Sequence, residues 1–195
     1  MKKLIVCMLF AAAMTAGAFA QVEGKVRGGL DIGAAIPKGG GGVCVNIPFG
    51  YNLKDNMNIG IRLGTAAMAK IDPFGEVGDL AANVNFLGTF NYYFNSGDNP
   101  VAPFVGCGAG IYTIAAVSGG GGFVTVEAGN RFGGMMTAGV EVAKFRLALE
   151  YNMIPSSAVK VTGTGSGVAI TNDKIKNSYF AFTVGFYIGG GKWKK

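Results

Sequence analysis

The sequence predicts an all-β fold, an eight-stranded antiparallel up-and-down transmembrane β-barrel, and three observations lead to this prediction. Residues 145–153, FRLALEYNM, carry a large apolar side chain at every odd position and a charged, small or polar one at every even position. This period of two is typical of a strand with two different faces. The alternation recurs along the chain without any sustained helical period, and the connections between segments differ in length. A sheet whose apolar face no helix covers is stable when it closes with that face in lipid.

The first twenty residues are organised like a secretory signal peptide. Two lysines precede an apolar run that ends at Ala13, and residues 18–20 form an A-x-A-like cleavage site. A membrane-spanning helix would need about 20 apolar residues, whereas polar residues begin at Gln21. We therefore expect residues 1–20 to be a cleaved leader and residues 21–195 to form a single barrel domain.

Eight segments of the remaining chain match the strand pattern. We predict strands at residues 25–36, 43–53, 57–69, 81–94, 101–117, 134–142, 145–154 and 178–189. The shorter connections are residues 54–56, 95–100 and 143–144, and the longer ones are residues 37–42, 70–80, 118–133 and 155–177. If both chain ends lie on one side, the short turns share that side and the longer loops share the other, as in outer-membrane barrels.

The same alternation assigns charged residues to the inward face. They are three cations and three anions, namely Arg27, Asp31, Arg62, Glu141, Arg146 and Glu150. Buried charges must be paired to be tolerated, and an eight-stranded barrel is just wide enough for side chains to fill. We expect one layer of Arg27, Glu141 and Arg146, with Glu141 opposite Arg146 across its hairpin, and one layer of Asp31, Arg62 and Glu150. Such a network would fill and fix the lumen; the alternative interpretation is a gated or ion-selective path.

Aromatic residues on the outward face gather near the predicted short turns. They are Tyr51, Tyr92, Phe94 and Phe145, and Trp193 lies close to the chain's end. We expect these five residues to lie at a membrane interface, where amphipathic aromatic rings settle. The pattern points Cys44 inward and Cys107 outward on non-adjacent strands, so we expect no disulfide between them.

One segment carries a family resemblance. Residues 103–112, PFVGCGAGIY, resemble the "PYVGAGxGY" strand, and with the leader, the strands and the segregated loops the chain resembles small outer-membrane barrels of the OmpA, OmpX and opacity-protein type. The resemblance implies an outer-membrane location, a loop-borne surface role and passage through the barrel-assembly machinery. Such proteins usually end in an aromatic residue that helps the assembly machinery recognise the last strand, whereas Trp193 here is followed by two lysines. We therefore expect this recognition signal to shift to Phe186 or Trp193.

The composition excludes several kinds of chemistry. The chain has no histidine, which removes Ser-His-Asp and Cys-His catalysis and zinc sites built on Cys and His. We expect no enzymatic activity and no cofactor. The net charge of +6 is mild and scattered along the chain, which argues against a nucleic-acid partner.

Two groups of loop residues could serve as binding sites. Asp72, Glu76 and Asp79 could hold a divalent cation, although a solvated loop is the simpler interpretation. Lys160, Lys174 and Lys176 could contact anionic lipopolysaccharide if their loop faces outward. The glycine runs at 39–42 and 119–122 lack the Gly-Lys-Ser/Thr ending of a phosphate loop.

Three function classes remain. The sequence favours a structural or surface-interacting outer-membrane barrel with outer-membrane lipid, lipopolysaccharide and a host or surface ligand as partners. The second is a narrow solute or ion channel. The third is a secreted, lipocalin-like carrier of an apolar ligand, which would need its hydrophobic residues inside, the reverse of the predicted arrangement.

Overall fold

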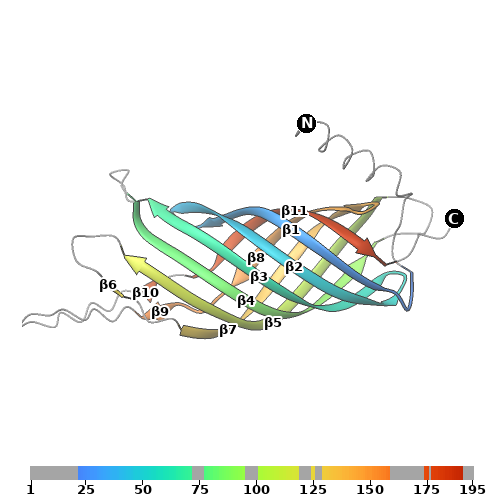
Figure 1. Cartoon of the computed structure of the whole chain (residues 1–195), viewed down its shortest axis with the longest axis horizontal. Coiled ribbons are helices and arrows are strands. Elements are labelled where there is room, and N and C mark those ends of the chain that lie inside the picture. Colours follow the sequence, from blue (N-terminus) through green and yellow to red (C-terminus); the bar gives the residue numbers. More distant parts are fainter. Residues whose placement is uncertain are drawn as a thin grey trace, which may run out of the picture.

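The computed structural model describes residues 22–71, 77–94, 101–118, 124–125, 129–158, 174–175 and 177–190. Eight of its strands form a closed antiparallel barrel (Figure 1). In chain order they are β1 (Val26–Pro37), β2 (Gly40–Lys54), β3 (Met57–Ile71), β4 (Val77–Tyr93), β5 (Val101–Ser118), β7 (Gly129–Val142), β8 (Phe145–Met153) and β11 (Tyr179–Gly189). Three two-residue strands lie outside the ring: β6 (Val124–Thr125) pairs with β5, and β9 (Ser157–Ala158) pairs with β10 (Lys174–Ile175).

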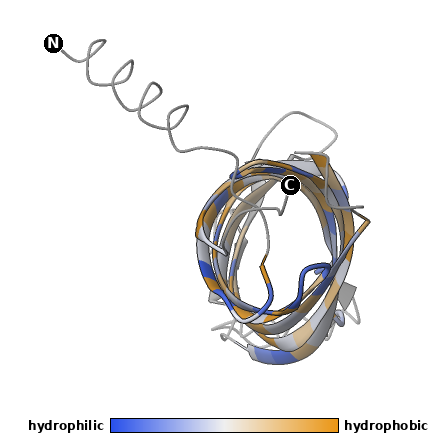
Figure 2. Ribbon diagram, turned by 90° about the vertical axis from the view of Figure 1, so that its right-hand side faces the viewer, coloured by the Kyte–Doolittle hydropathy of each residue, from blue (hydrophilic) through white to orange (hydrophobic). Residues whose placement is uncertain are grey.

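The first and last barrel strands close the ring. β1 pairs with β11 along its length, from Arg27 opposite Gly189 to Pro37 opposite Tyr179. Figure 2 looks along the barrel and shows the closed ring. Closure satisfies the backbone groups that an edge strand would leave unpaired. The prediction of an eight-stranded antiparallel up-and-down barrel is confirmed.

The two ends of the barrel differ in what they carry. The turns at residues 55–56 and 143–144 lie at one end, at the right of Figure 1, which we call the short-turn end. The described chain termini meet there, because the Val22 N–H donates to the Gly190 carbonyl at 2.6 Å. The opposite end, which we call the loop end, holds the β1–β2 turn, the end of β8 and the start of β11.

The β1–β2 connection is shorter than the sequence suggested. We expected a longer loop over residues 37–42, but the turn consists of Lys38 and Gly39 alone, and β2 begins at Gly40. Gly39 has φ +80°, a left-handed conformation that glycine adopts without steric cost. The prediction that all the connections at this end are long was therefore wrong for this hairpin. β7 likewise begins at Gly129, earlier than the predicted start at 134.

Side chains alternate across the barrel wall. Along β8, the residues from Phe145 to Asn152 are in turn exposed and buried, and all eight barrel strands expose large apolar side chains such as Ile32, Val43, Ile61, Phe86, Val105, Met136, Leu149 and Phe182. The nine residues of β8 lie within the range of about 9 to 11 that a tilted strand needs to cross a bilayer.

Among the residues that the structure describes, no helix is long and apolar enough to cross a membrane.

Aromatic rings occupy much of the lumen. Tyr93, Phe104 and Tyr112 are each at most 1 % exposed, although all three point away from the apolar outer face. Glycines leave space for large inward side chains: a Cβ at Gly29 would overlap the Tyr187 ring, and one at Gly133 would crowd Tyr112. The interior is therefore packed by a few large side chains against bare backbone.

Candidate functional site in the barrel lumen

All six charged residues that the alternation assigned to the inward face are buried in the structure. Their exposed fractions lie between 3 % and 7 % for Arg27, Asp31, Arg62, Glu141, Arg146 and Glu150. They come from β1, β3, β7 and β8; five of them form two clusters with neighbouring polar residues, and Asp31 contacts the first of these clusters.

The first cluster lies toward the short-turn end and consists of Arg27, Tyr93, Glu141, Arg146 and Tyr187; we call it the short-turn cluster. The Arg27 guanidinium forms an ion pair with Glu141 at 2.8 Å. Tyr93 completes a triangle, because its hydroxyl accepts from Arg27 and donates to Glu141, each at 3.3 Å. The Arg27 Cζ also lies 4.2 Å from the centroid of the Tyr187 ring, a cation–π distance.

Arg146 belongs to the same cluster but forms no ion pair among the described residues. Its guanidinium donates to the Tyr187 hydroxyl at 2.8 Å and to the Asn91 side-chain oxygen at 3.2 Å. Its Cζ lies 3.9 Å from the centroid of the Phe104 ring. The buried cation is thus held by two neutral acceptors and an aromatic face.

The second cluster lies deeper in the barrel and consists of Arg62, Tyr112, Glu150 and Asn152; we call it the mid-lumen cluster. Arg62 forms an ion pair with Glu150 at 2.8 Å. The Asn152 side-chain oxygen accepts from Tyr112 at 2.9 Å and from Arg62 at 3.4 Å. The last of these contacts is long for a hydrogen bond, so Glu150 is the main partner of Arg62.

Asp31 contacts the short-turn cluster. Its carboxylate accepts a hydrogen bond from the Tyr187 hydroxyl at 3.1 Å, and that hydroxyl accepts in turn from Arg146. The other Asp31 oxygen lies above Gly185, where a Cβ would overlap it. Glycine at position 185 therefore makes room for the Asp31 carboxylate.

The pairing differs from the expected layers in two contacts. Glu141 and Arg146 do face each other in the β7–β8 register, but Glu141 pairs with Arg27. Asp31, which we placed with Arg62 and Glu150, contacts Tyr187 of the other cluster. Arg27 reaches across the lumen to Glu141 because its side chain is long. Asp31 meets Tyr187 along the wall, since Gly29 and Asp31 of β1 lie opposite Tyr187 and Gly185 of β11.

The ion pairs span the barrel. In the strand order of the closed ring, β3 and β8 are separated by three strands on each side, so the Arg62–Glu150 pair joins opposite walls. The Arg27–Glu141 pair joins β1 to β7, which are also not neighbours. Register between adjacent strands predicts no such contacts, and the residues that sequence analysis missed, Tyr93, Tyr187 and Asn152, are the ones that complete them.

Several buried polar atoms in the lumen lack a partner within the described protein. They are Asp31 Oδ1, Arg62 Nε, Asn83 Nδ2, Asn85 Oδ1, Thr137 Oγ1 and Asn152 Nδ2. None belongs to the short-turn cluster. Buried polar atoms are nearly always hydrogen-bonded to protein or water, so the region around the mid-lumen cluster is the less completely satisfied part of the interior.

The outward aromatics lie at both ends of the barrel. Tyr51, Phe94 and Phe145 are exposed near the short turns, and Tyr92 is half-buried with its ring 5.1 Å from that of Phe94. A pair that we did not predict, Tyr151 and Phe180, stacks at the loop end with ring centroids 4.6 Å apart. Trp193 lies outside the described residues.

The other candidate positions are distributed as follows. Cys44 is buried on β2 and Cys107 is exposed on β5, and both thiols are free. Asp72, Glu76, Lys160 and Lys176 lie outside the described residues, as do the side chains of Asp79 and Lys174. Within the part of the chain that is described, no three or more His, Cys, Asp or Glu residues are grouped so that they could hold a metal ion.

Comparisons with known proteins agree on the fold. No protein-family model matches the chain, and no curated protein matches it. Among solved structures, Neisserial surface protein A aligns at 17 % identity with a TM-score of 0.52, covering 84 % of this chain and 95 % of that one. The N-terminal β-barrel domain of OprF from Pseudomonas aeruginosa aligns at 13 % identity with a TM-score of 0.50, covering 86 % of this chain and all of that domain. The chain thus has the fold of the small outer-membrane barrels that its sequence resembles.

Proposed function

We propose that this chain is an integral outer-membrane barrel without enzymatic activity, closed by its lumen network, whose role is structural or lies in surface interactions through its loops. The observation that carries the proposal is that apolar and charged side chains lie on the faces opposite to those they occupy in a soluble protein. Large apolar side chains are exposed on all eight strands, while the six charges are buried.

The exterior supports a membrane location. Monomeric soluble proteins rarely expose contiguous apolar patches larger than a few hundred Å², whereas an apolar belt with aromatic residues at both ends is typical of outer-membrane barrels. The buried charges weigh against a lipocalin-like carrier, because an apolar ligand would need an apolar interior. Export by a leader over residues 1–20 and insertion by the barrel-assembly machinery follow from this proposal.

The interior supports a closed barrel. The Arg62–Glu150 ion pair crosses the full width of the lumen, and Tyr93, Phe104 and Tyr112 fill space around the two clusters. Removing one partner of a buried pair typically costs about 3 to 5 kcal/mol, so a state in which these contacts are broken to open a path would be rarely populated. We assign the network to bracing the barrel.

Recognition by the loops is supported by fold analogy and by charge alone. The loops of a rigid barrel can vary in sequence while the strands of the wall keep the fold. The positive charges of Lys160, Lys174 and Lys176 would favour contact with anionic lipopolysaccharide. Reversing the charge of all three and measuring binding of the protein to lipopolysaccharide tests this role: weaker binding is expected, and unchanged binding would remove it.

A narrow channel is the second candidate function. The six buried polar atoms without a protein partner favour it, because a hydrated interior is what a conducting path requires.

Single-channel recording in planar bilayers distinguishes the two candidates. We expect wild-type protein to show no conductance steps, and Arg62→Ala to be less stable and equally silent. Arg131→Ala, which changes an exposed arginine at the loop end of β7, serves as the control. Discrete steps in the wild type that Arg62→Ala alters and Arg131→Ala does not would establish the channel and overturn the closed barrel.

A further inference from the structure

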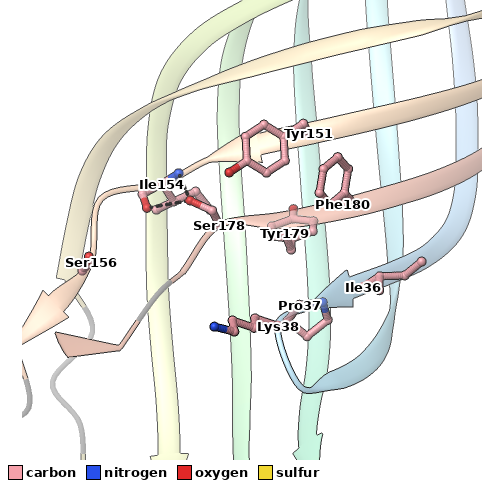
Figure 3. Close-up of a pocket in the computed structure, with 9 residues that line it drawn as sticks. All are labelled: Ile36, Pro37, Lys38, Tyr151, Ile154, Ser156, Ser178, Tyr179 and Phe180. Carbon is pink, nitrogen blue, oxygen red and sulfur yellow. Dashed lines mark hydrogen bonds between the residues drawn. The ribbon is translucent and has the colours of Figure 1, made fainter. Parts of the chain in front are cut away.

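A groove lies at the loop end of the barrel wall, between the β1–β2 turn and the start of β11. It has a volume of about 590 Å³ and is lined by Ile36, Pro37, Lys38, Tyr151, Ile154, Ser156, Ser178, Tyr179 and Phe180. Figure 3 shows these residues, which come from the ends of β1, β8 and β11 and from the segments that follow or precede them. The groove is separate from both lumen clusters.

The groove combines an apolar wall with a single cation. Ile36 and Phe180 are about half exposed on the outer face, at 51 % and 49 %, and Phe180 stacks on Tyr151. Buried Ile154 and Tyr179 contribute the deeper lining. Lys38 is exposed, and no carboxylate lines the groove. The lining therefore suits a ligand with a hydrocarbon part and a negative charge.

Hydrogen bonds hold this region in place. The Ser178 hydroxyl accepts from the Ile154 N–H and donates to the Ile154 carbonyl, both at 3.1 Å (Figure 3). The Asn177 side-chain amide donates to the Pro155 carbonyl at 2.8 Å. These contacts tie the segment after β8 to the segment before β11 and fix one side of the groove.

We propose that this groove binds one phospholipid of net negative charge from the surrounding leaflet, with an acyl chain against Ile36, Tyr151 and Phe180 and the anionic headgroup beside Lys38. The Tyr151–Phe180 pair places the groove at the level where aromatic rings meet lipid headgroups. A lysine near the membrane surface attracts anionic lipid, and at this position the attraction coincides with an apolar wall. The inference rests on the membrane location proposed above.

Quenching by brominated lipids tests the site. In protein purified from its membrane, Trp193→Phe removes the only tryptophan, and Phe180→Trp then reports on the groove. Val84→Trp, on the outer face of β4 and 59 % exposed, reports on the ordinary lipid-facing wall. The probes are dibrominated phosphatidylglycerol and dibrominated phosphatidylcholine in vesicles.

The expected result is a preference for the anionic lipid of about fivefold at position 180 and no preference at position 84. Lys38→Gln should abolish the preference, whereas Lys54→Gln, which changes an exposed lysine at the short-turn end, should leave it intact. Equal quenching by the two lipids at position 180, or a preference that survives Lys38→Gln, would overturn the lipid site. Absence of quenching at both positions by both lipids would instead overturn the membrane location itself.

Discussion

The two lumen clusters hold their charges in different ways. In the short-turn cluster, Arg27 has an ion-pair partner, a tyrosine hydroxyl and an aromatic face, and none of the cluster's fully buried polar atoms lacks a partner. In the mid-lumen cluster, Arg62 depends on Glu150 and one long contact to Asn152, and its Nε is unpartnered. The number of alternative partners, more than the presence of an ion pair, should decide how much each carboxylate contributes to stability.

The largest expected effect comes from removing the charge of Glu150. Glu150→Gln leaves the buried Arg62 with no strong partner, so the free energy of unfolding should fall by about 3 to 5 kcal/mol. Glu141→Gln should cost about 2 kcal/mol, because Tyr93 and Tyr187 still contact Arg27. Urea titration in lipid vesicles, followed by the electrophoretic shift between folded and unfolded protein, measures both values. An equal or larger loss of stability for Glu141→Gln would contradict the claim that the number of alternative partners decides how much each carboxylate contributes.

The tyrosine hydroxyls should rank next. Tyr187→Phe removes a group that accepts from Arg146 and donates to Asp31, and hydrogen bonds to charged groups contribute about 1.5 to 3 kcal/mol. Tyr112→Phe removes a neutral hydrogen bond to Asn152 and should cost about 1 kcal/mol. The same unfolding titration checks the order. If Tyr112→Phe is the more destabilising change, the mid-lumen cluster is braced by neutral contacts and the assignment of its stability to Glu150 fails.

An effect of similar size to that of the tyrosine changes should come from Gly185→Ala. The added methyl group would overlap the Asp31 carboxylate, and overpacking typically costs about 1 to 3 kcal/mol. Gly88→Ala is the matched control, because position 88 is exposed and a Cβ there would meet only the Ala109 carbonyl oxygen at 3.8 Å. It should change stability by less than about 0.5 kcal/mol. Equal midpoints for the two variants would show that the Asp31 carboxylate has room to move away from position 185.

The sequence predicts the wall of this barrel better than its interior contacts. Alternation along residues 145–153 is enough to place Arg146 and Glu150 inside and Leu149 outside, because the side-chain direction in a strand depends only on parity. The β1–β2 turn was mispredicted because Gly40, Gly41 and Gly42 resemble a loop, whereas they pair in register with β3. Glycine in a strand carries no side-chain signal of its own.

The partners inside the lumen could not be predicted from the sequence for a different reason. The register of neighbouring strands places Glu141 opposite Arg146, but the lengths of the side chains and the strand order bring Glu141 to Arg27. Tyr93 and Tyr187 stand at inward positions by parity, and nothing in the local pattern shows that they bridge charges. Only closure of the ring sets these distances.

The most direct test of the central claim uses the native thiol of Cys107. This exposed residue lies on β5 between Phe90 and Met136 of the neighbouring strands, whereas Cys44 is buried in the lumen. A spin label is attached to Cys107 in a Cys7→Ser background, and its collision rates with oxygen and with a water-soluble nickel chelate are compared in vesicles. We expect frequent collisions with oxygen and few with the chelate. Frequent collisions with the nickel chelate would mean that the apolar outer face meets water, which would contradict the membrane barrel.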